Sequence, residues 1–220
     1  MKKLLWSIWI VSLLGLAACG KSDKEEVDPT PPPGQTDDDK KDDNEQEEDY
    51  ITDMELAFPD PIFRTYVLEN FDTDGNGKIS EGEALAVKKI DVSGSESSWK
   101  AGEGIASLKG VEYFTNLTEL SCYYNQLTSL DVSNNTQLDF LHCGLNQLTL
   151  LDLSNNTLLD RLNCHSNQLT ALDVSNNTRL LELRCSGNQL TSLDVSNNTQ
   201  LVRLDCWYNQ LTALDVSNNT

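Results

Sequence analysis

A hydrophobic pattern with a period of 21 residues governs the second half of the chain. The frame L-x-x-L-x-C-x-x-N-Q-L-T-x-L-D-V-S-N-N-T-x restarts at Leu117, Leu138, Leu159, Leu180 and Leu201. Apolar residues at positions 4 and 6 of this frame predict a short strand with these side chains inward, and with positions 3, 5, 7 and 8 outward. Position 9 is asparagine in every copy. We expect its amide to satisfy backbone groups at the turn that ends the strand.

The second half of each copy repeats the order of the first. In the first copy the residues of the second half that mirror Leu117, Leu120, Cys122 and Asn125 are Leu127, Leu130, Val132 and Asn135. Because valine and threonine favour extended backbone, we expect this second arm to be extended and partly strand-like instead of helical. One copy cannot bury its own apolar side, so neighbouring copies must stack and share a core.

The first eleven positions of the frame resemble the leucine-rich-repeat signature, with cysteine where leucine often stands. The predicted fold class is therefore an α/β leucine-rich-repeat solenoid with parallel strands on its concave side. A half-formed copy at 105–116 leads into five repeats at 117–220. The last copy stops at Thr220 without a closing segment, and solenoids need capped ends. We therefore expect the natural chain to be longer.

A small helical cap is expected at residues 50–104, ahead of the repeats. Asp60 followed by Pro61 is a typical helix start. Apolar residues then recur at helical spacing as far as Phe71.

The twelve residues after this helix match the EF-hand calcium loop, including the glycine at position 6. An alternative is that Ser80 and Glu83 only form a capping box for a next helix, from Glu83 to about Ile90. Both can hold together, but only calcium explains the acidic residues at the start of the loop. The expected ligands of a structural calcium ion are Asp72, Asp74, Asn76, Lys78 through its carbonyl, Ser80 through water, and Glu83.

The N-terminus carries signals for export. A basic start and an apolar run at 4–16, too short to span a membrane, predict a signal peptide at 1–18. The sequence Leu16-Ala17-Ala18-Cys19 resembles the lipobox of bacterial lipoproteins, which implies a lipid on Cys19. An ordinary signal peptide with a chance cysteine is the alternative. Residues 19–49 are acidic and almost without apolar side chains, so we expect a disordered tether.

Five cysteines remain besides Cys19, one in each repeat. Neighbouring parallel strands lie about 4.8 Å apart, whereas the β-carbons of a disulfide prefer about 3.8 Å. We therefore expect a buried ladder of free thiols that behave as small hydrophobic side chains. A single-file stack does not supply a zinc site either.

The cysteine-bearing repeats and the EF-hand-like cap resemble the internalin class and the leucine-rich lipoproteins of Gram-negative anaerobes. This resemblance covers roughly residues 50–220. It implies a lipid-anchored protein of the outer membrane or cell surface, facing outward, that acts in adhesion or ligand binding. We expect a monomer. The net charge of −19 argues against nucleic acid as a partner.

Sequence variation among the repeats is concentrated at the outward positions of the predicted concave face. Exposed aromatic and arginine side chains on a rigid sheet are typical anchors for a protein or glycan partner. An alternative is that these positions vary simply because the fold does not constrain them, which requires no ligand. The candidate ligand-binding residues are Tyr123, Tyr124, Phe140, His142, Arg161, His165, Arg184, Arg203, Trp207 and Tyr208.

Catalysis is not expected. The two histidines lie on adjacent predicted strands at different heights. The sequence has no nucleophile motif, no paired carboxylates in a plausible cleft and no glycine-rich phosphate loop. A structural spacer in the envelope, without a specific ligand, remains the main alternative to a binding role.

Overall fold

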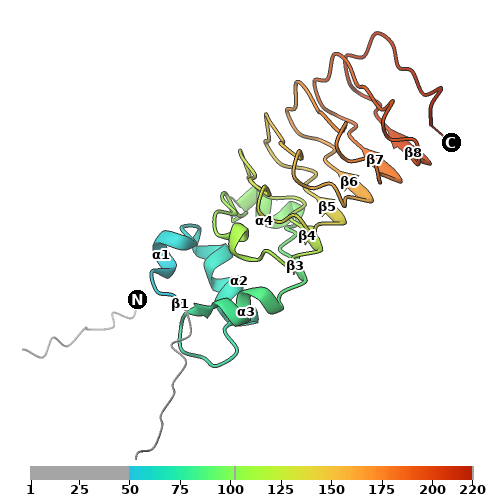
Figure 1. Cartoon of the computed structure of the whole chain (residues 1–220). Coiled ribbons are helices and arrows are strands. Elements are labelled where there is room, and N and C mark those ends of the chain that lie inside the picture. Colours follow the sequence, from blue (N-terminus) through green and yellow to red (C-terminus); the bar gives the residue numbers. More distant parts are fainter. Residues whose placement is uncertain (1–49, 102, 220) are drawn as a thin grey trace, which may run out of the picture. The chain divides into compact units, whose positions relative to one another are not determined.

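Residues 50–101 and 103–219 are described by a computed structural model, without the side chains of residues 99–101. These residues form a helical cap followed by a stack of similar coils (Figure 1). The predicted signal peptide, Cys19 and the acidic tether lie outside the described residues. No helix within the described ranges has the length and apolar character needed to cross a membrane.

A six-stranded parallel sheet runs along one side of the stack. Each strand pairs in register with the equivalent strand of the next coil, so that Leu120 lies beside Leu141 and Leu141 beside Leu162. This confirms the parallel strands predicted from the repeat. The strands are β3 (Lys89–Asp91), β4 (Glu119–Ser121), β5 (Phe140–His142), β6 (Arg161–Asn163), β7 (Glu182–Arg184) and β8 (Arg203–Asp205).

The core of the coils is a set of rows of identical side chains. The leucines at position 4 are buried in the first four repeats, as Leu120 and Leu141 show, and Leu204 in the last repeat is partly buried. The cysteines at position 6 follow directly after the strands and are free thiols. Cys122, Cys143 and Cys164 are fully buried, whereas Cys206 in the last coil is only partly covered. The predicted thiol ladder is confirmed.

Asparagine at position 9 closes the strand side of each coil. In the third repeat the Asn167 amide donates to the carbonyl of Cys143 at 3.0 Å and to that of Cys164 at 3.1 Å. Its side-chain oxygen accepts a bond from the Leu148 amide at 2.9 Å. One buried side chain thus satisfies backbone groups of two adjacent coils, as predicted.

The second arm of each coil is built from tight turns. In the third repeat the Asn177 amide donates to Leu153 and Asn156 in the preceding coil, at 3.1 and 2.8 Å. The backbone amides of Asn177 and Leu180 bond to residues three positions earlier. Because these amides are used inside turns, they cannot form a ladder between coils. The prediction of a non-helical arm is confirmed for the described residues, but its partly strand-like character is wrong.

The cap consists of short helices and one small antiparallel pair of strands. Asp60 is the N-cap of the predicted helix, which begins at Pro61. The elements are β1 (Tyr50–Ile51), α1 (Met54–Ala57), α2 (Pro61–Phe71), β2 (Ile79–Ser80), α3 (Glu81–Ala86), α4 (Glu96–Ala101) and the 3-10 helix η1 (Val111–Tyr113).

The helix predicted from Glu83 to about Ile90 is wrong in its second half. Helix α3 ends at Ala86, and Lys89–Asp91 forms β3, the first strand of the sheet. The backbone amide of Glu119 at the edge of β4 bonds to the Lys88 carbonyl at 3.0 Å. The segment Lys89–Asp91, with Ile90 buried between two exposed charged residues, therefore pairs with the free edge of the first repeat and does not extend the helix. The first coil thus includes β3, and the half-formed copy at 105–116 supplies its second arm.

Candidate functional site

The sheet exposes two rows of side chains on its concave face. The in-register pairing places position 3 of each repeat beside position 3 of the next, and position 5 likewise. The first row contains Glu119, Phe140, Arg161, Glu182 and Arg203, and the second contains Ser121, His142, Asn163, Arg184 and Asp205.

An aromatic cluster lies at the N-terminal end of these rows. The Tyr123 ring lies 4.7 Å from the His142 ring and 5.9 Å from the His165 ring, measured between centroids. The two histidine rings are 5.9 Å apart although they occupy different heights. Gly144 makes this contact possible, because a β-carbon at this position would lie 2.5 Å from Nδ1 of His165.

His142 is held in its neutral form. Burial lowers its pKa to about 4, with further lowering by His165 and Arg184. Its Nε2 atom is buried without a hydrogen-bond partner. On the neighbouring coil, Nδ1 of His165 lies 2.6 Å from the side-chain oxygen of Asn163. The His142 imidazole is therefore uncharged above about pH 4, and burial lowers the pKa of His165 as well.

Arginines occupy the middle and C-terminal part of the face. The Arg161 guanidinium lies over the Phe140 ring, 4.7 Å from its centroid. The Glu182 carboxylate forms ion pairs with the guanidinium groups of Arg184 and Arg203, with nitrogen–oxygen distances of 2.5 and 3.3 Å. A hollow of about 240 Å³ is lined by several of these side chains. Guanidinium groups and aromatic faces together suit ligands that combine polar and apolar groups.

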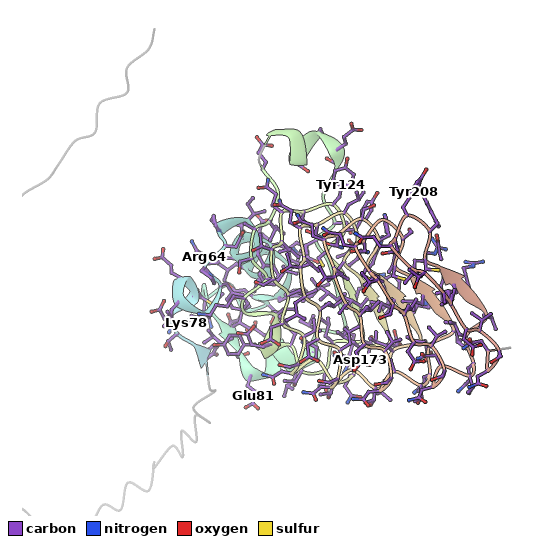
Figure 2. The ribbon with its side chains drawn as sticks, turned by 90° about the horizontal axis from the view of Figure 1, so that it is seen from above. Arg64, Lys78, Glu81, Tyr124, Asp173 and Tyr208 are labelled. Carbon is purple, nitrogen blue, oxygen red and sulfur yellow. The ribbon has the colours of Figure 1, made fainter. Side chains whose placement is uncertain are left out.

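A second aromatic pair lies at the C-terminal end of the face. Trp207 and Tyr208 are 59% and 77% exposed, with ring centroids 4.4 Å apart. Tyr208 and its equivalent Tyr124 both have left-handed backbone, with φ of 52° and 61°. Figure 2 shows these two tyrosines along the same side of the coils, with Asp173 on the opposite side. The residues between them on this edge are smaller, for example Ser166 and Gly187.

The predicted calcium loop brings its acidic residues together. Asp72, Asp74 and Glu83 each offer an oxygen within 4.8 Å of the others. Two oxygens bound to one Ca²⁺ at about 2.4 Å lie no more than about 4.8 Å apart, so the oxygen set fits this ion. Gly77, at position 6, has the left-handed φ of 78° that the sharp turn requires. Ile79, inside the loop, pairs with Ile51 in a short antiparallel pair of strands.

The capping box predicted for the same loop is confirmed. Glu83 accepts bonds from the Ser80 amide at 2.9 Å and from the Thr73 amide at 2.6 Å. Burial raises the pKa of Glu83, but these backbone bonds and those of the two hydroxyls outweigh it and lower the pKa to about 2. The carboxylate is thus charged at neutral pH. The Asn76 side chain donates to Asp74 at 2.7 Å, and the Lys78 amide to Asn76 at 2.8 Å.

Comparison with known proteins identifies similar repeats. No family model matches the chain. It is 43% identical over 79 residues to Internalin J of Listeria monocytogenes serotype 4b, which is 36% of this chain and 8% of that protein. A solved functional domain of InlJ from Listeria monocytogenes, described as including a cysteine ladder, has a TM-score of 0.67 and 40% identity. It matches 75% of this chain, which spans 35% of that domain.

A second solved structure, the internalin InlF of Listeria monocytogenes, has a TM-score of 0.59 and 28% identity. The match covers 75% of this chain and 47% of that one. The fold is an internalin-like leucine-rich-repeat solenoid. The thiols of this solenoid lie one to each repeat, and burial raises the pKa of Cys122 to about 12.

The structure brings half of the ten predicted face residues into two groups on the solenoid. Tyr123, His142 and His165 form the N-terminal cluster, and Trp207 and Tyr208 the C-terminal pair. The arginines lie between them. Sequence reasoning missed the role of Gly144, although a glycine among larger residues at position 7 was a visible signal.

Asp60 also has a second role that the helix-start pattern did not reveal. One carboxylate oxygen caps α2 through the amides of Ile62 and Phe63. The other accepts bonds from the amides of Ala106 and Ser107 at 2.8 and 3.2 Å. This side chain therefore ties the cap to the first coil of the solenoid.

Proposed function

We propose that this protein is a lipid-anchored recognition protein of the cell surface that binds a protein or glycan partner through its concave face. The observation that carries the proposal is that exposed arginine and aromatic side chains lie side by side on one in-register sheet and on the turns that directly follow its strands. Such side chains dominate binding energy at protein interfaces. Cys19 would carry the lipid, which would place the protein in the outer membrane, facing outward.

The rigidity of the sheet supports this role. Each strand is fixed by its neighbours in register and by the buried asparagine that follows it. Side chains on such a scaffold lose little further freedom when a partner binds, so less of the contact energy is spent on ordering. Similarity to internalin structures agrees with a binding role, but the chain spans less than half of each of them.

We also propose a structural calcium ion in the cap loop. The carboxylates of Asp72, Asp74 and Glu83 would bind it, together with the Asn76 side chain and the Lys78 carbonyl. Ser80 would act through water. The ion would neutralise carboxylates that otherwise repel one another, and would thereby stabilise the cap.

The binding role is tested with arrays of proteins and glycans. The intact chain is expected to bind a ligand, and the double variant Tyr123→Ala/Trp207→Ala to lose that binding without a change in melting temperature. Leu150→Ala is the matched control, because Leu150 is 70% exposed and lies on the second arm of its coil, away from the strands and the residues that directly follow them. Absence of any array signal from the intact chain would favour a spacer without a ligand.

A further inference from the structure

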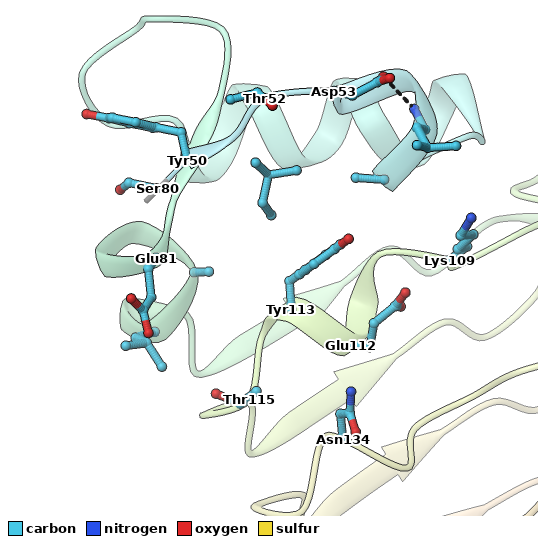
Figure 3. A pocket seen from close by; sticks show the side chains of 15 residues that line it. Tyr50, Thr52, Asp53, Ser80, Glu81, Lys109, Glu112, Tyr113, Thr115 and Asn134 are labelled. Carbon is cyan, nitrogen blue, oxygen red and sulfur yellow. Dashed lines mark hydrogen bonds between the residues drawn. The ribbon is translucent and has the colours of Figure 1, made fainter. Parts of the chain in front are cut away.

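A cleft separate from the concave face lies where the cap meets the first coil. We call it the cap cleft. It has a volume of about 870 Å³ and is lined by residues of α1, α3 and η1. Figure 3 shows Tyr113 in the middle of this cleft, with Glu81 on one side and Lys109 and Glu112 on the other. The volume lies within the range of about 300–1,000 Å³ of ligand pockets.

Large apolar side chains from three elements converge on the cap cleft and remain exposed. Leu56 of α1 is 67% exposed, Leu85 of α3 38% and Tyr113 of η1 42%. The residues next to them in sequence are buried, as Ala57 and Ala84 are at 6% and 4%. The exposed side chains are thus carried by backbone that the core fixes in place. Exposed apolar groups gathered around a hollow are typical of interaction sites.

The rim of the cap cleft is acidic. Asp53, Glu81 and Glu112 contribute carboxylates, against the single ammonium of Lys109. Two of the carboxylates are oriented by the backbone: Asp53 accepts the Leu56 amide at 2.9 Å, and Glu112 accepts the Gly110 amide at 2.6 Å. A ligand for this cleft must therefore combine apolar groups with positive charge.

The chain itself does not supply such a ligand from the segment before the cap. Residues 20–49 contain Val27 as their one large aliphatic side chain, no aromatic residue, and many acids. A second copy of the chain carries the same net charge of −19. Both would be repelled by the rim, which leaves a basic partner.

We propose that the cap cleft docks a basic amphipathic segment of a partner protein. One or two large apolar side chains of the segment would contact Leu56, Leu85 and Tyr113. Flanking lysine or arginine residues would pair with Asp53, Glu81 and Glu112. This is the recognition mode in which an amphipathic segment places its apolar side in a groove. It is independent of ligand binding at the concave face.

The experiment uses fluorescence anisotropy of the full chain with three synthetic twelve-residue peptides at 0.15 M salt. The first peptide combines leucine and tryptophan with lysine. The second has glutamate in place of lysine, and the third has serine in place of leucine and tryptophan. We expect the first peptide to bind, the second not to bind, and the third to bind at least about tenfold more weakly, because burial of one large apolar side chain contributes about 1.5–3 kcal/mol.

Variants locate the peptide on the protein. Leu56→Ser and Glu81→Lys should each weaken the first peptide about tenfold or more, whereas Leu150→Ser, an equally exposed site on the solenoid, should not. Equal binding of the first and third peptides would overturn the proposal, since it would show attraction by net charge alone. Loss of binding in Tyr123→Ala/Trp207→Ala with retention in Leu56→Ser would assign the peptide to the concave face and would also overturn it.

Discussion

The asparagine at position 9 shows how one residue type can dictate a repeat. A strand that ends at a turn leaves backbone groups without ladder partners, and burying them unpaired is costly. The Asn167 amide fills this gap with two donors and one acceptor, and links adjacent coils in doing so. A hydroxyl or carboxylate at this position could not supply both donors at once.

Replacement of Asn167 by alanine is therefore expected to lower the free energy of unfolding by roughly 2–4 kcal/mol, because buried backbone groups lose their partners. Asn176→Ala is the matched control within the same repeat, since its exposed amide makes a single 3.4 Å bond. The Asn176→Ala substitution should lower the free energy of unfolding by less than about 0.5 kcal/mol, as is usual for surface positions. Urea unfolding measures both values, and equal costs would contradict the assigned role.

His142 makes a second residue-level prediction, on the effect of pH. Its folded pKa is about 4, below the ordinary value of 6.5, because burial, His165 and Arg184 disfavour the charged form while Asp91 opposes them weakly. As the pH falls below 6.5 the unfolded chain takes up a proton that the folded chain refuses until about pH 4. Stability is therefore lost in this window.

His142→Gln should remove this part of the acid sensitivity. Intact and variant chains are compared by their urea midpoints at pH 7 and pH 4.5, where the carboxylates of both titrate alike. The variant is expected to lose less stability between the two pH values. Parallel losses would show that His142 does not resist protonation in the folded protein.

At the scale of elements, the cap combines two devices in one loop. The capping box of Ser80 and Glu83 begins α3, while the acidic residues before it lie close enough for a shared cation. Helix α3 in turn leads directly into β3, which pairs with the first repeat. A change that stabilises the loop is therefore also expected to stabilise the first strands of the sheet.

Removal of calcium should lower the melting temperature of the full chain, measured with excess calcium and then with a chelator. Asp72→Asn should abolish the difference between the two conditions, because it removes a charged ligand. Asp53→Asn retains the difference, since Asp53 caps α1 outside the loop. An unchanged melting temperature of the intact chain in the chelator would contradict the proposed calcium site.

Periodic features of these elements could be read from the sequence, whereas local competition between elements could not. The inward leucines, the thiol ladder and Asn167 follow from spacing alone. The end of α3 could not be predicted in this way, because the residues after it pair with the free edge of β4, which is a tertiary effect. The tight turns of the second arm were also not predicted, because valine and threonine indicated only extended backbone there.

The candidate sites divide in the same way. Outward positions such as Tyr123 and Trp207 could be assigned from the repeat, because register fixes their face. The approach of His165 to His142 depends on the missing side chain at Gly144, which spacing does not reveal. The cap cleft arises where helices meet the first coil, and no local pattern in the sequence predicts such a junction.

At the scale of the whole molecule, a repeated scaffold carries two different surfaces. The concave face is mixed in charge and rich in aromatic groups, whereas the cap cleft is apolar with an acidic rim. Because the scaffold positions are nearly identical among repeats, substitutions on the face can change binding with little effect on stability. This separation is what a recognition protein requires.

The most direct test of the concave-face proposal is the affinity of one array-selected ligand for three forms of the chain, measured by surface plasmon resonance. The intact protein and Leu56→Ser are predicted to bind alike, because Leu56 lies in the cap. Tyr123→Ala/Trp207→Ala is predicted to lose at least about tenfold in affinity, since hot-spot aromatic residues each contribute about 2 kcal/mol or more. Undiminished binding by this double variant, at unchanged stability, would contradict the assignment of ligand recognition to the concave face.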